Sequence, residues 1–194
     1  MPDQDIYRPE TGNGEARRAV LIITDNGTED LEFFYPYYRF IEAGYKVDVA
    51  TPDGRMFAGK HGLGLKESKK IKDMKEENYV LLYLPGGQAP ASLKNNLDVL
   101  AITRSFAAKE KPIAAICHGP QILAAAGVID KRKLAAWPEV KDEVVTAGAV
   151  FVDKETLTDG PFITARWPGD LPAFMKETLK YLERKKDARS NIAA

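Results

Sequence analysis

The sequence predicts an α/β fold, in which a mainly parallel β-sheet carries helices on both faces. Short and almost continuously apolar segments alternate with longer segments whose apolar residues recur at helical spacing. Several of the longer segments end at a glycine, which is a common helix stop. The 194 residues are 44 % hydrophobic and 29 % charged, an ordinary globular balance. A chain of this length buries enough surface to fold without disulfide or metal support.

The apolar segments have the pattern of strands that are buried on both faces of a parallel sheet. We predict four such strands, at Ala19–Thr24, Lys46–Ala50, Tyr79–Leu84 and Ile113–Ile116. The segments between and after them are predicted as helices, at Leu31–Ala43, Leu97–Glu110, Pro120–Ala126, Pro138–Ala147 and Leu171–Arg184. We expect a single domain over residues 18–185, with a polar flexible arm at 1–17 and a tail at 186–194.

Composition excludes several classes of partner. The sequence has 28 lysine and arginine residues and 28 aspartate and glutamate residues, so its formal net charge is zero. Electrostatic attraction therefore does not favour a nucleic acid as the main partner. No apolar run approaches the roughly 18–20 residues of a membrane helix. The first residues lack the apolar core of a secretory signal, and a single cysteine makes no internal disulfide. We therefore expect a cytoplasmic protein.

Cys117 is the first candidate for chemistry, because it stands between a predicted strand and a predicted helix. A side chain on such a sharp turn projects beyond the carboxyl edge of the sheet, where ligands of α/β proteins bind. The start of the following helix favours the thiolate over the thiol. The alternative is a buried structural cysteine, since free cysteines are among the most buried residues.

Three other residues are expected at the same edge of the sheet. Gly86 and Gly87 follow the strand at Tyr79–Leu84, so their backbone N–H groups can approach a bound substrate closely. Gly87 would supply one oxyanion donor and the N–H of His118 the other, unless the two glycines form only a turn. Glu29 precedes the first helix, where a carboxylate either faces the site or simply interacts with the helix dipole.

These motifs together resemble the DJ-1/PfpI superfamily, and within it the PfpI-type intracellular protease branch, peptidase family C56. The resemblance covers residues 19–183 and rests on the segments AAICHGPQ (114–121), LPGG (84–87) and EDLE (29–32). It implies a flavodoxin-like three-layer sandwich related to class I glutamine amidotransferases. It also implies a homodimer or a higher oligomer.

The resemblance implies roles for individual residues. Cys117 matches the nucleophile, Glu29 the carboxyl that contacts its sulfur, and Gly87 and His118 the backbone oxyanion donors. The His118 imidazole matches the proposed catalytic histidine of the PfpI branch. However, Ala91 stands where that branch has a glutamate that orients the histidine, so a Cys–His pair here lacks its third member. Side chains of adjacent residues also usually point apart, which argues against contact between Cys117 and His118.

The pair of Cys117 and Glu29 suits one reaction. A thiolate and a carboxylate in contact share one proton, which is most simply placed on Glu29. The thiolate then adds to an aldehyde, and Glu29 moves a proton at the neighbouring carbon, so that a 2-oxoaldehyde becomes a 2-hydroxy acid. The resemblance implies glyoxalase III or deglycase activity of this kind, on a small aldehyde or a glycated substrate. Two histidines and one cysteine form no convincing metal site, and we expect no cofactor.

Two alternatives stay open. One is a PfpI-type cysteine peptidase, which Ala91 disfavours. The other is a non-catalytic redox sensor or chaperone, suggested by an oxidisable sulfur and by the aromatic cluster on the first predicted helix formed by Phe33, Phe34, Tyr35, Tyr37 and Tyr38. Those aromatic residues are equally explained by the core and by subunit contacts. His61 is expected to have a structural or interface role. Trp137 and Arg166-Trp167-Pro168 lie on predicted loops beside the site, where packing explains the tryptophans equally well.

Overall fold

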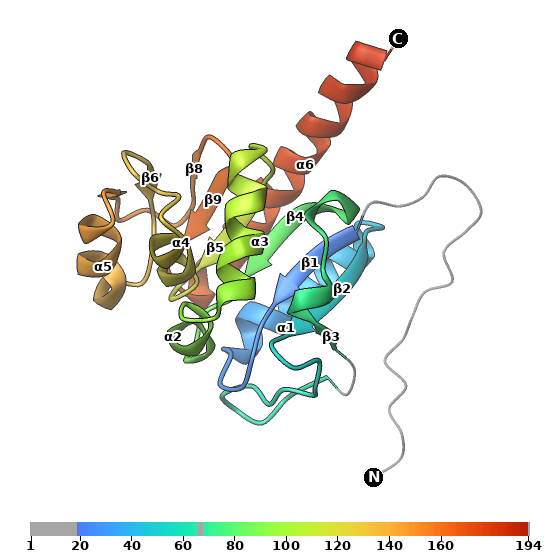
Figure 1. Ribbon diagram of the computed structural model, residues 1–194. Coiled ribbons are helices and arrows are strands. Elements are labelled where there is room, and N and C mark those ends of the chain that lie inside the picture. The colour runs from blue at the N-terminus through green and yellow to red at the C-terminus, as the bar shows by residue number, and fades with distance from the viewer. Residues whose placement is uncertain (1–18, 66–67, 194) are drawn as a thin grey trace.

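The central feature of the fold is a seven-stranded sheet with strand order β3-β2-β1-β4-β5-β9-β8, seen in a computed structural model (Figure 1). The structure describes residues 19–65 and 68–193, with side chains as far as residue 186, so the predicted arm at 1–17 lies outside the described residues. All neighbouring strands are parallel except β8 and β9. The predicted α/β class with a mainly parallel sheet is confirmed.

The four strands predicted from sequence form the middle of this sheet, and each starts at the predicted residue. They are β1 (Ala19–Ile23), β2 (Lys46–Thr51), β4 (Tyr79–Leu84) and β5 (Ile113–Ile116). Sequence reasoning missed five shorter strands, namely β3 (Lys69–Lys70), β6 (Lys133–Leu134), β7 (Val150–Phe151), β8 (Leu157–Asp159) and β9 (Phe162–Ala165). Segments of two to four residues are too short to show a periodicity, so long-range pairing defines them.

The predicted helices differ from the observed ones mainly at their ends, and a short helix at Ala89–Leu93 was not predicted. The observed helices are α1 (Asp30–Glu42), α2 (Ala89–Leu93), α3 (Leu97–Ala108), α4 (Pro120–Ala126), α5 (Lys141–Thr146) and α6 (Leu171–Ala193). Short 3₁₀ turns are η1 (Ile71–Asp73), η2 (Glu76–Asn78), η3 (Pro138–Val140) and η4 (Pro168–Asp170). The helix predicted at Pro138–Ala147 is therefore split into η3 and α5. The last helix does not end at Arg184, because the following residues contain neither proline nor glycine.

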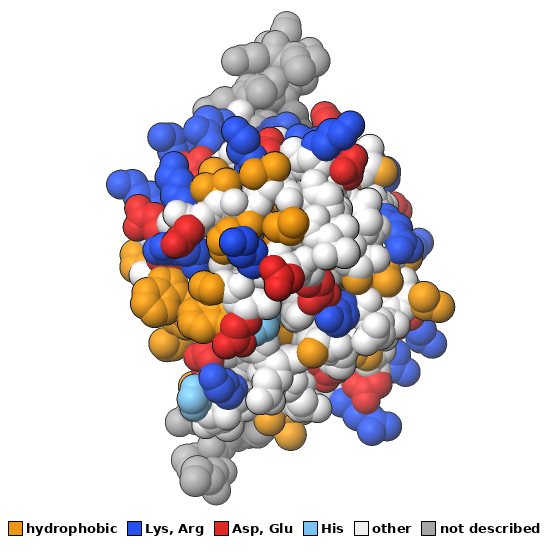
Figure 2. Space-filling model, turned by 90° about the vertical axis from the view of Figure 1, so that its left-hand side faces the viewer, with side chains coloured by type: hydrophobic (Ala, Val, Ile, Leu, Met, Phe, Trp, Pro, Cys, Tyr) orange, Lys and Arg blue, Asp and Glu red, His pale blue; other side chains and the backbone are white. Residues whose placement is uncertain are grey.

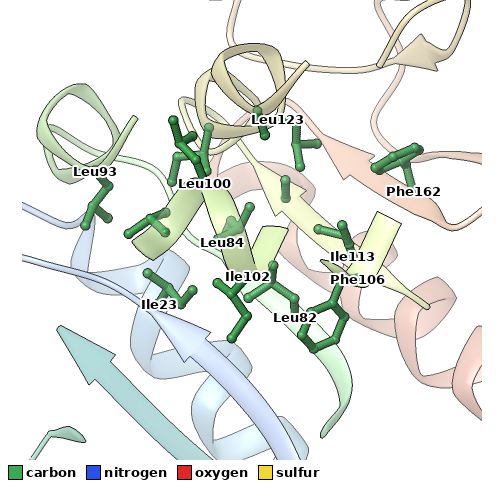
Figure 3. Packing of buried hydrophobic residues seen from close by; sticks show 14 of the residues in the cluster. Ile23, Leu82, Leu84, Leu93, Leu100, Ile102, Phe106, Ile113, Leu123 and Phe162 are labelled. Carbon is green, nitrogen blue, oxygen red and sulfur yellow. The ribbon is translucent and has the colours of Figure 1, made fainter. Parts of the chain in front are cut away.

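Two hydrophobic clusters cover the two faces of the sheet. Alternate residues of β1 divide between them, with Leu21 and Ile23 on one face and Val20 and Ile22 on the other. The first cluster packs beneath α3 and α4 (Figure 3), and the second beneath α1 and α6. A sheet buried on both faces places its polar chemistry at the strand ends. No helix in the described ranges is long and apolar enough to cross a membrane.

Candidate active site

Cys117 occupies the turn between β5 and α4 in a conformation that few non-glycine residues adopt. Its φ is 60°, in the left-handed region. Three backbone hydrogen bonds hold the turn, from the Cys117 N–H to Ala165 O at 3.0 Å, from the Trp137 N–H to Cys117 O at 3.0 Å, and from the Gly119 N–H to Ile116 O at 2.8 Å. The side chain is 7 % exposed. Strain held in place by the surrounding fold is typical of a functional turn.

Gly86 and Gly87 bring the loop after β4 against this turn. A side chain on Gly86 would collide with the cysteine turn and with an acid from α1, because an added Cβ would lie 2.5 Å from Glu32 Oε2 and 2.7 Å from Cys117 Cβ. Gly87 has a φ of 83° and pairs with Thr28 across an isolated β-bridge. The backbone N–H groups of Gly87 and His118 both hydrogen-bond the Cys117 sulfur. These are the two N–H groups that the sequence singled out.

The carboxyl that contacts the sulfur belongs to Glu32, and the prediction of Glu29 for this position is corrected. Glu32 is fully buried on α1 and accepts the Gly86 N–H through Oε2 at 2.9 Å, and it lies beside Cys117 because a Cβ added at Gly86 would meet both Glu32 Oε2 and Cys117 Cβ. Its other oxygen, Oε1, is buried without a hydrogen-bond partner among the described residues. The Tyr83 hydroxyl donates to the Glu32 backbone carbonyl at 2.8 Å, which fixes this turn of the helix.

Glu29 lies one helical turn earlier and faces a different set of residues. Its carboxylate is 3.6 Å from Lys60 Nζ and 3.8 Å from His61 Nε2, with 13 % of the side chain exposed. Glu29 is the N-cap residue of α1 and has an extended backbone (φ −68°, ψ 118°), so it stands before the first turn of the helix. Glu32 instead follows the buried stripe of α1 that continues with Pro36 and Phe40. An acid on that stripe was the signal that sequence reasoning missed.

A loop from Phe57 to Gly64 brings Lys60 and His61 to Glu29. Asp30 holds this loop, because its carboxylate accepts the His61 N–H at 2.8 Å and the Leu63 N–H at 3.0 Å. The Lys60 N–H donates to Thr28 O at 2.7 Å, which ties the loop to the β1–α1 connection. The His61 side chain is 64 % exposed at the edge of the site, and its structural or interface role stays a prediction.

The His118 imidazole does contact the sulfur, contrary to the expectation that adjacent side chains point apart. Its Nδ1 lies 3.2 Å from Cys117 Sγ. The left-handed conformation of Cys117 changes the relative direction of the two side chains, and sequence spacing alone does not reveal such a conformation. Burial lowers the pKa of His118, so the neutral imidazole predominates near pH 7.

The electrostatics of the pair differ from the sequence-based expectation of a thiolate favoured by the helix start. Burial and the nearby Glu32 carboxylate raise the pKa of Cys117, and the two N–H donors only partly oppose this. Burial raises the pKa of Glu32 to about 8. Glu32 therefore keeps its proton near neutral pH, so its charge no longer opposes ionisation of the sulfur, and the two groups titrate as a pair.

Two tryptophans extend from this site. The Trp137 ring lies 6.5 Å from the His118 ring, and the Trp167 ring lies 6.3 Å from Trp137, each with an interplanar angle of 31°. Figure 2 shows histidine, acidic and hydrophobic side chains close together on one face of the molecule. Within the described ranges no cluster of three or more histidine, cysteine or acidic side chains has the arrangement of a metal site.

Three features define the class of this protein, namely a cysteine on a strained strand-to-helix turn, a Gly-Gly loop that faces it, and a buried acid on the first helix. The chain belongs to the DJ-1/PfpI family, which it matches over residues 17–181. Deglycase PH1704 from Pyrococcus horikoshii is 40 % identical over 164 residues, which are 84 % of this chain and 99 % of the relative. Protein/nucleic acid deglycase 2 from Escherichia coli is 38 % identical over 170 residues, 86 % and 98 % of the two chains. The crystal structure of Drosophila melanogaster DJ-1beta superposes with a TM-score of 0.80 at 25 % identity, over 92 % of this chain and 99 % of that one. These likenesses support an enzyme of this family with a flavodoxin-like fold.

Proposed function

We propose that this protein is a cysteine-dependent deglycase that converts 2-oxoaldehydes such as methylglyoxal, and their adducts with amines, into 2-hydroxy acids. The observation that carries the proposal is the buried Glu32 carboxyl beside Cys117, with its pKa raised to about 8. A group that holds a proton near neutral pH and releases it readily is suited to both donate and accept one during a reaction cycle. The deglycase names of the relatives support the same activity.

The Cys117 thiol first loses its proton to the solvent, which returns a proton to Glu32 at the end of the cycle, and the resulting thiolate adds to the aldehyde carbon. A C–S bond forms, the carbonyl π electrons move to oxygen, and that oxygen takes the Glu32 proton to give a hemithioacetal. For an adduct, the C–N bond breaks as sulfur replaces nitrogen, and the amine leaves with the proton. The N–H groups of Gly87 and His118, which hydrogen-bond the sulfur, are suited to stabilise the oxygen on the same carbon.

Glu32, now a carboxylate, completes the rearrangement. It removes the proton from the sulfur-bearing carbon to form an enediol and returns a proton to the neighbouring carbon, which leaves a 2-hydroxyacyl thioester. Water then cleaves the thioester, and the thiol and the 2-hydroxy acid are released. The neutral His118 imidazole, 3.2 Å from the sulfur, is placed to accept the proton of that water. One water is consumed for each aldehyde or adduct, and no oxidant is needed.

The test compares two acids one helical turn apart. Cys117→Ala should abolish lactate formation from methylglyoxal, and Glu32→Gln should lower kcat by about 10²- to 10⁴-fold, because a general acid–base is lost. Glu29→Gln is the matched control, and its kcat should fall by less than about fivefold, because the Glu29 carboxylate faces Lys60 and His61. Lactate is measured enzymatically after the folding of each variant is checked by circular dichroism. Lactate formation by Cys117→Ala at the wild-type rate would contradict the proposal.

A PfpI-type peptidase is the second candidate, favoured by the contact of Cys117 with His118. Against it, Ala91 on α2 offers no carboxylate, so the described part of the chain supplies no orienting acid at that position. A fluorogenic peptide assay separates the two functions. Cleavage that disappears in His118→Ala while lactate formation persists would support the peptidase.

A further inference from the structure

The two tryptophans beside the site form a line of rings that the reaction itself does not use. The sequence contains only two tryptophans, and both lie here. We call Trp137 and Trp167 the tryptophan pair. Trp137 is half-buried next to His118, whereas Trp167 is 48 % exposed at the outer end of the line. An exposed indole this close to a nucleophile is a feature that often binds ligands.

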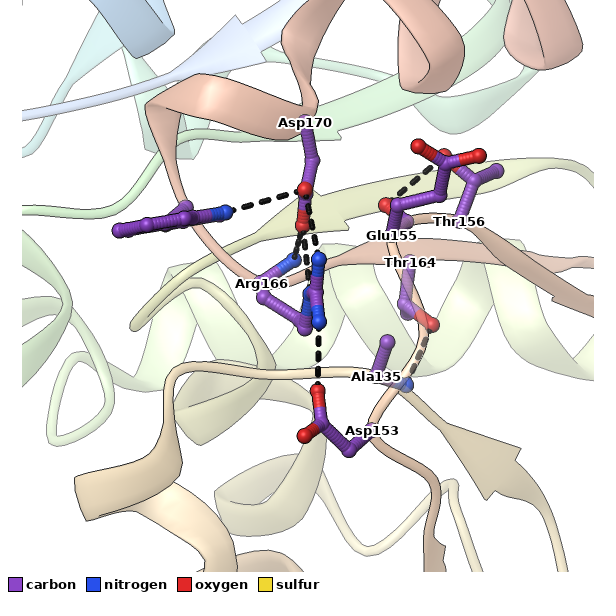
Figure 4. Close-up of polar contacts among 8 residues, drawn as sticks. Ala135, Asp153, Glu155, Thr156, Thr164, Arg166 and Asp170 are labelled. Atoms are coloured by element: carbon purple, nitrogen blue, oxygen red, sulfur yellow. Dashed lines mark hydrogen bonds and ion pairs between the residues drawn. The ribbon is translucent and has the colours of Figure 1, made fainter.

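Trp167 is exposed but fixed in orientation. Its Nε1–H donates to Asp170 Oδ1 at 3.0 Å, and Asp170 is 5 % exposed. Asp170 is held in turn by Arg166, through Nε at 2.9 Å and a second guanidinium nitrogen at 3.0 Å (Figure 4). Gly169 lies against the ring, since an added Cβ there would be 3.4 Å from it. A ring held in this way loses little conformational entropy when a ligand stacks on it.

The position of Trp167 limits what can reach it. Ring-to-ring distances of 6.5 and 6.3 Å connect His118 to Trp167 through Trp137, so we expect a three-carbon aldehyde bound at Cys117 not to reach Trp167. We expect a single glycated amino acid to extend as far as Trp137. Each further peptide residue adds up to about 3.5 Å, so the residues next to a glycated side chain are those that reach Trp167.

The charges around the pair favour a polypeptide over a nucleic acid. Arg166 is adjacent to Trp167 in the sequence, and it is already paired with Asp170 and with Asp153, whose carboxylate is 2.6 Å away (Figure 4). Glu139, two residues after Trp137, is exposed and carries a further negative charge. Excess negative charge repels phosphates, whereas a cationic side chain gains from stacking on an indole.

We infer that the tryptophan pair is a subsite for the polypeptide part of a glycated protein, an inference that rests on the proposed function. In this subsite Trp167 binds a residue next to the adduct and prefers a cationic residue. Specificity for extended substrates then resides in Trp167, whereas the chemistry resides in Cys117 and Glu32. The preference distinguishes a peptide-borne adduct from free methylglyoxal.

Binding is tested without turnover in the Cys117→Ala variant. The probes are five-residue peptides with a central arginine, flanked either by trimethyl-lysine, which does not react with aldehydes, or by glutamate. Because both tryptophans lie in the subsite, intrinsic fluorescence reports on it directly. We expect Trp167→Leu to weaken binding of the trimethyl-lysine peptide by about 5- to 30-fold. Trp167→Phe, which retains a ring, should weaken binding by less than about threefold. Leu97→Ala, at an exposed position on α3, is the control for nonspecific effects.

Kinetics provide the second measurement. With lactate release as the readout, Trp167→Leu should raise KM for the glycated trimethyl-lysine peptide at least about fivefold more than KM for glycated N-acetylarginine amide. Equal effects on the two substrates, or unchanged peptide binding in Trp167→Leu, would overturn the inference. Stronger binding of a short oligonucleotide than of the peptide would also overturn it, in favour of a nucleic-acid subsite. Absence of lactate from wild type, with peptide binding that depends on Trp167, would instead refute only the proposed function.

Discussion

At the scale of single residues, the site depends on the different environments of two glutamates. Glu29 and Glu32 stand three positions apart at the start of α1, yet one lies beside Lys60 and His61 and the other beside Cys117. Burial raises the pKa of Glu32 to about 8, while the partly exposed Glu29 faces a lysine. In the proposed reaction the glutamate side chain carries a proton at one position, whereas at the other it is an ion-pair partner.

The raised pKa of Glu32 makes a prediction about stability. The pKa of Glu32 in the folded state lies above the unfolded value of 4.5. The contribution of Glu32 to the free energy of unfolding is therefore fully present below about pH 4.5 and is lost as pH rises through about 8. The free energy of unfolding should fall across this interval with a slope of up to about 1.4 kcal/mol per pH unit, and Glu32→Gln should remove that slope. Urea unfolding between pH 5 and 8 measures it. A Glu29→Gln variant should retain the slope, and a wild-type protein with none would contradict the assignment.

At the scale of elements, the β1–α1 connection organises the site by binding two other loops. It pairs with the Gly-Gly loop through Thr28 and Gly87, and it holds the Phe57–Gly64 loop through Asp30. The Glu29 N–H donates to Gly86 O at 3.2 Å, which joins the helix start to the glycine loop. Three segments distant in sequence are thereby fixed around one sulfur atom.

Asp30→Ala tests this arrangement. Asp30 is 4 % exposed, and its loss leaves the His61 and Leu63 N–H groups without acceptors. We expect unfolding to become easier by about 1–3 kcal/mol and exchange of these two amides to accelerate strongly. Hydrogen exchange followed by NMR measures both effects. The matched control is Asp53→Ala, an exposed acid that within the described part of the chain bonds the N–H and the guanidinium of Arg55 in its own turn. Amides that stay protected in Asp30→Ala would show that another contact holds the loop.

At the scale of the whole molecule, an ion-pair cluster joins the segment before β4 to the segment before β5. Glu76 on η2 pairs with Lys109 and Lys111, which follow α3, and its side chain is only 4 % exposed. Lys111 Nζ also donates to the Glu76 backbone carbonyl at 2.8 Å. The two central strands are thus connected at the end of the sheet opposite the candidate site.

Glu76→Gln should therefore weaken the fold as a whole. Burial alone would raise the pKa of Glu76, but pairing with the two lysines lowers this pKa below 4.5. The contribution of Glu76 to the free energy of unfolding is therefore present above pH 4.5 and is lost as pH falls through the folded-state pKa. We expect a loss of about 1–3 kcal/mol in the free energy of unfolding at pH 7, and a smaller difference from wild type in acid. Urea titrations at pH 7 and pH 3 measure it. Glu77→Gln, at the exposed neighbouring position, should leave the free energy of unfolding unchanged at both pH values. An equal loss of stability in Glu77→Gln would show that the loss arises from η2 itself and not from the Glu76 ion pairs.

Local pattern was sufficient for the central strands and for the position of Cys117, Gly86 and Gly87 at one edge of the sheet. Apolar runs specify buried strands, glycines and prolines mark their ends, and parallel strands bring their carboxyl ends together whatever the rest of the chain does. These are properties of short segments and of one rule of sheet geometry.

Only the tertiary structure decided which glutamate contacts the sulfur, that His118 reaches it, and that Trp137 and Trp167 lie side by side. Each of these depends on the direction of a side chain or on a contact between distant segments. The packing of α1 on the sheet turns Glu32 inward, the left-handed turn at Cys117 redirects its neighbour, and the pairing of β9 with β5 brings the loop of Trp167 to that of Trp137. Such directions arise from packing over the whole fold, which no local pattern contains.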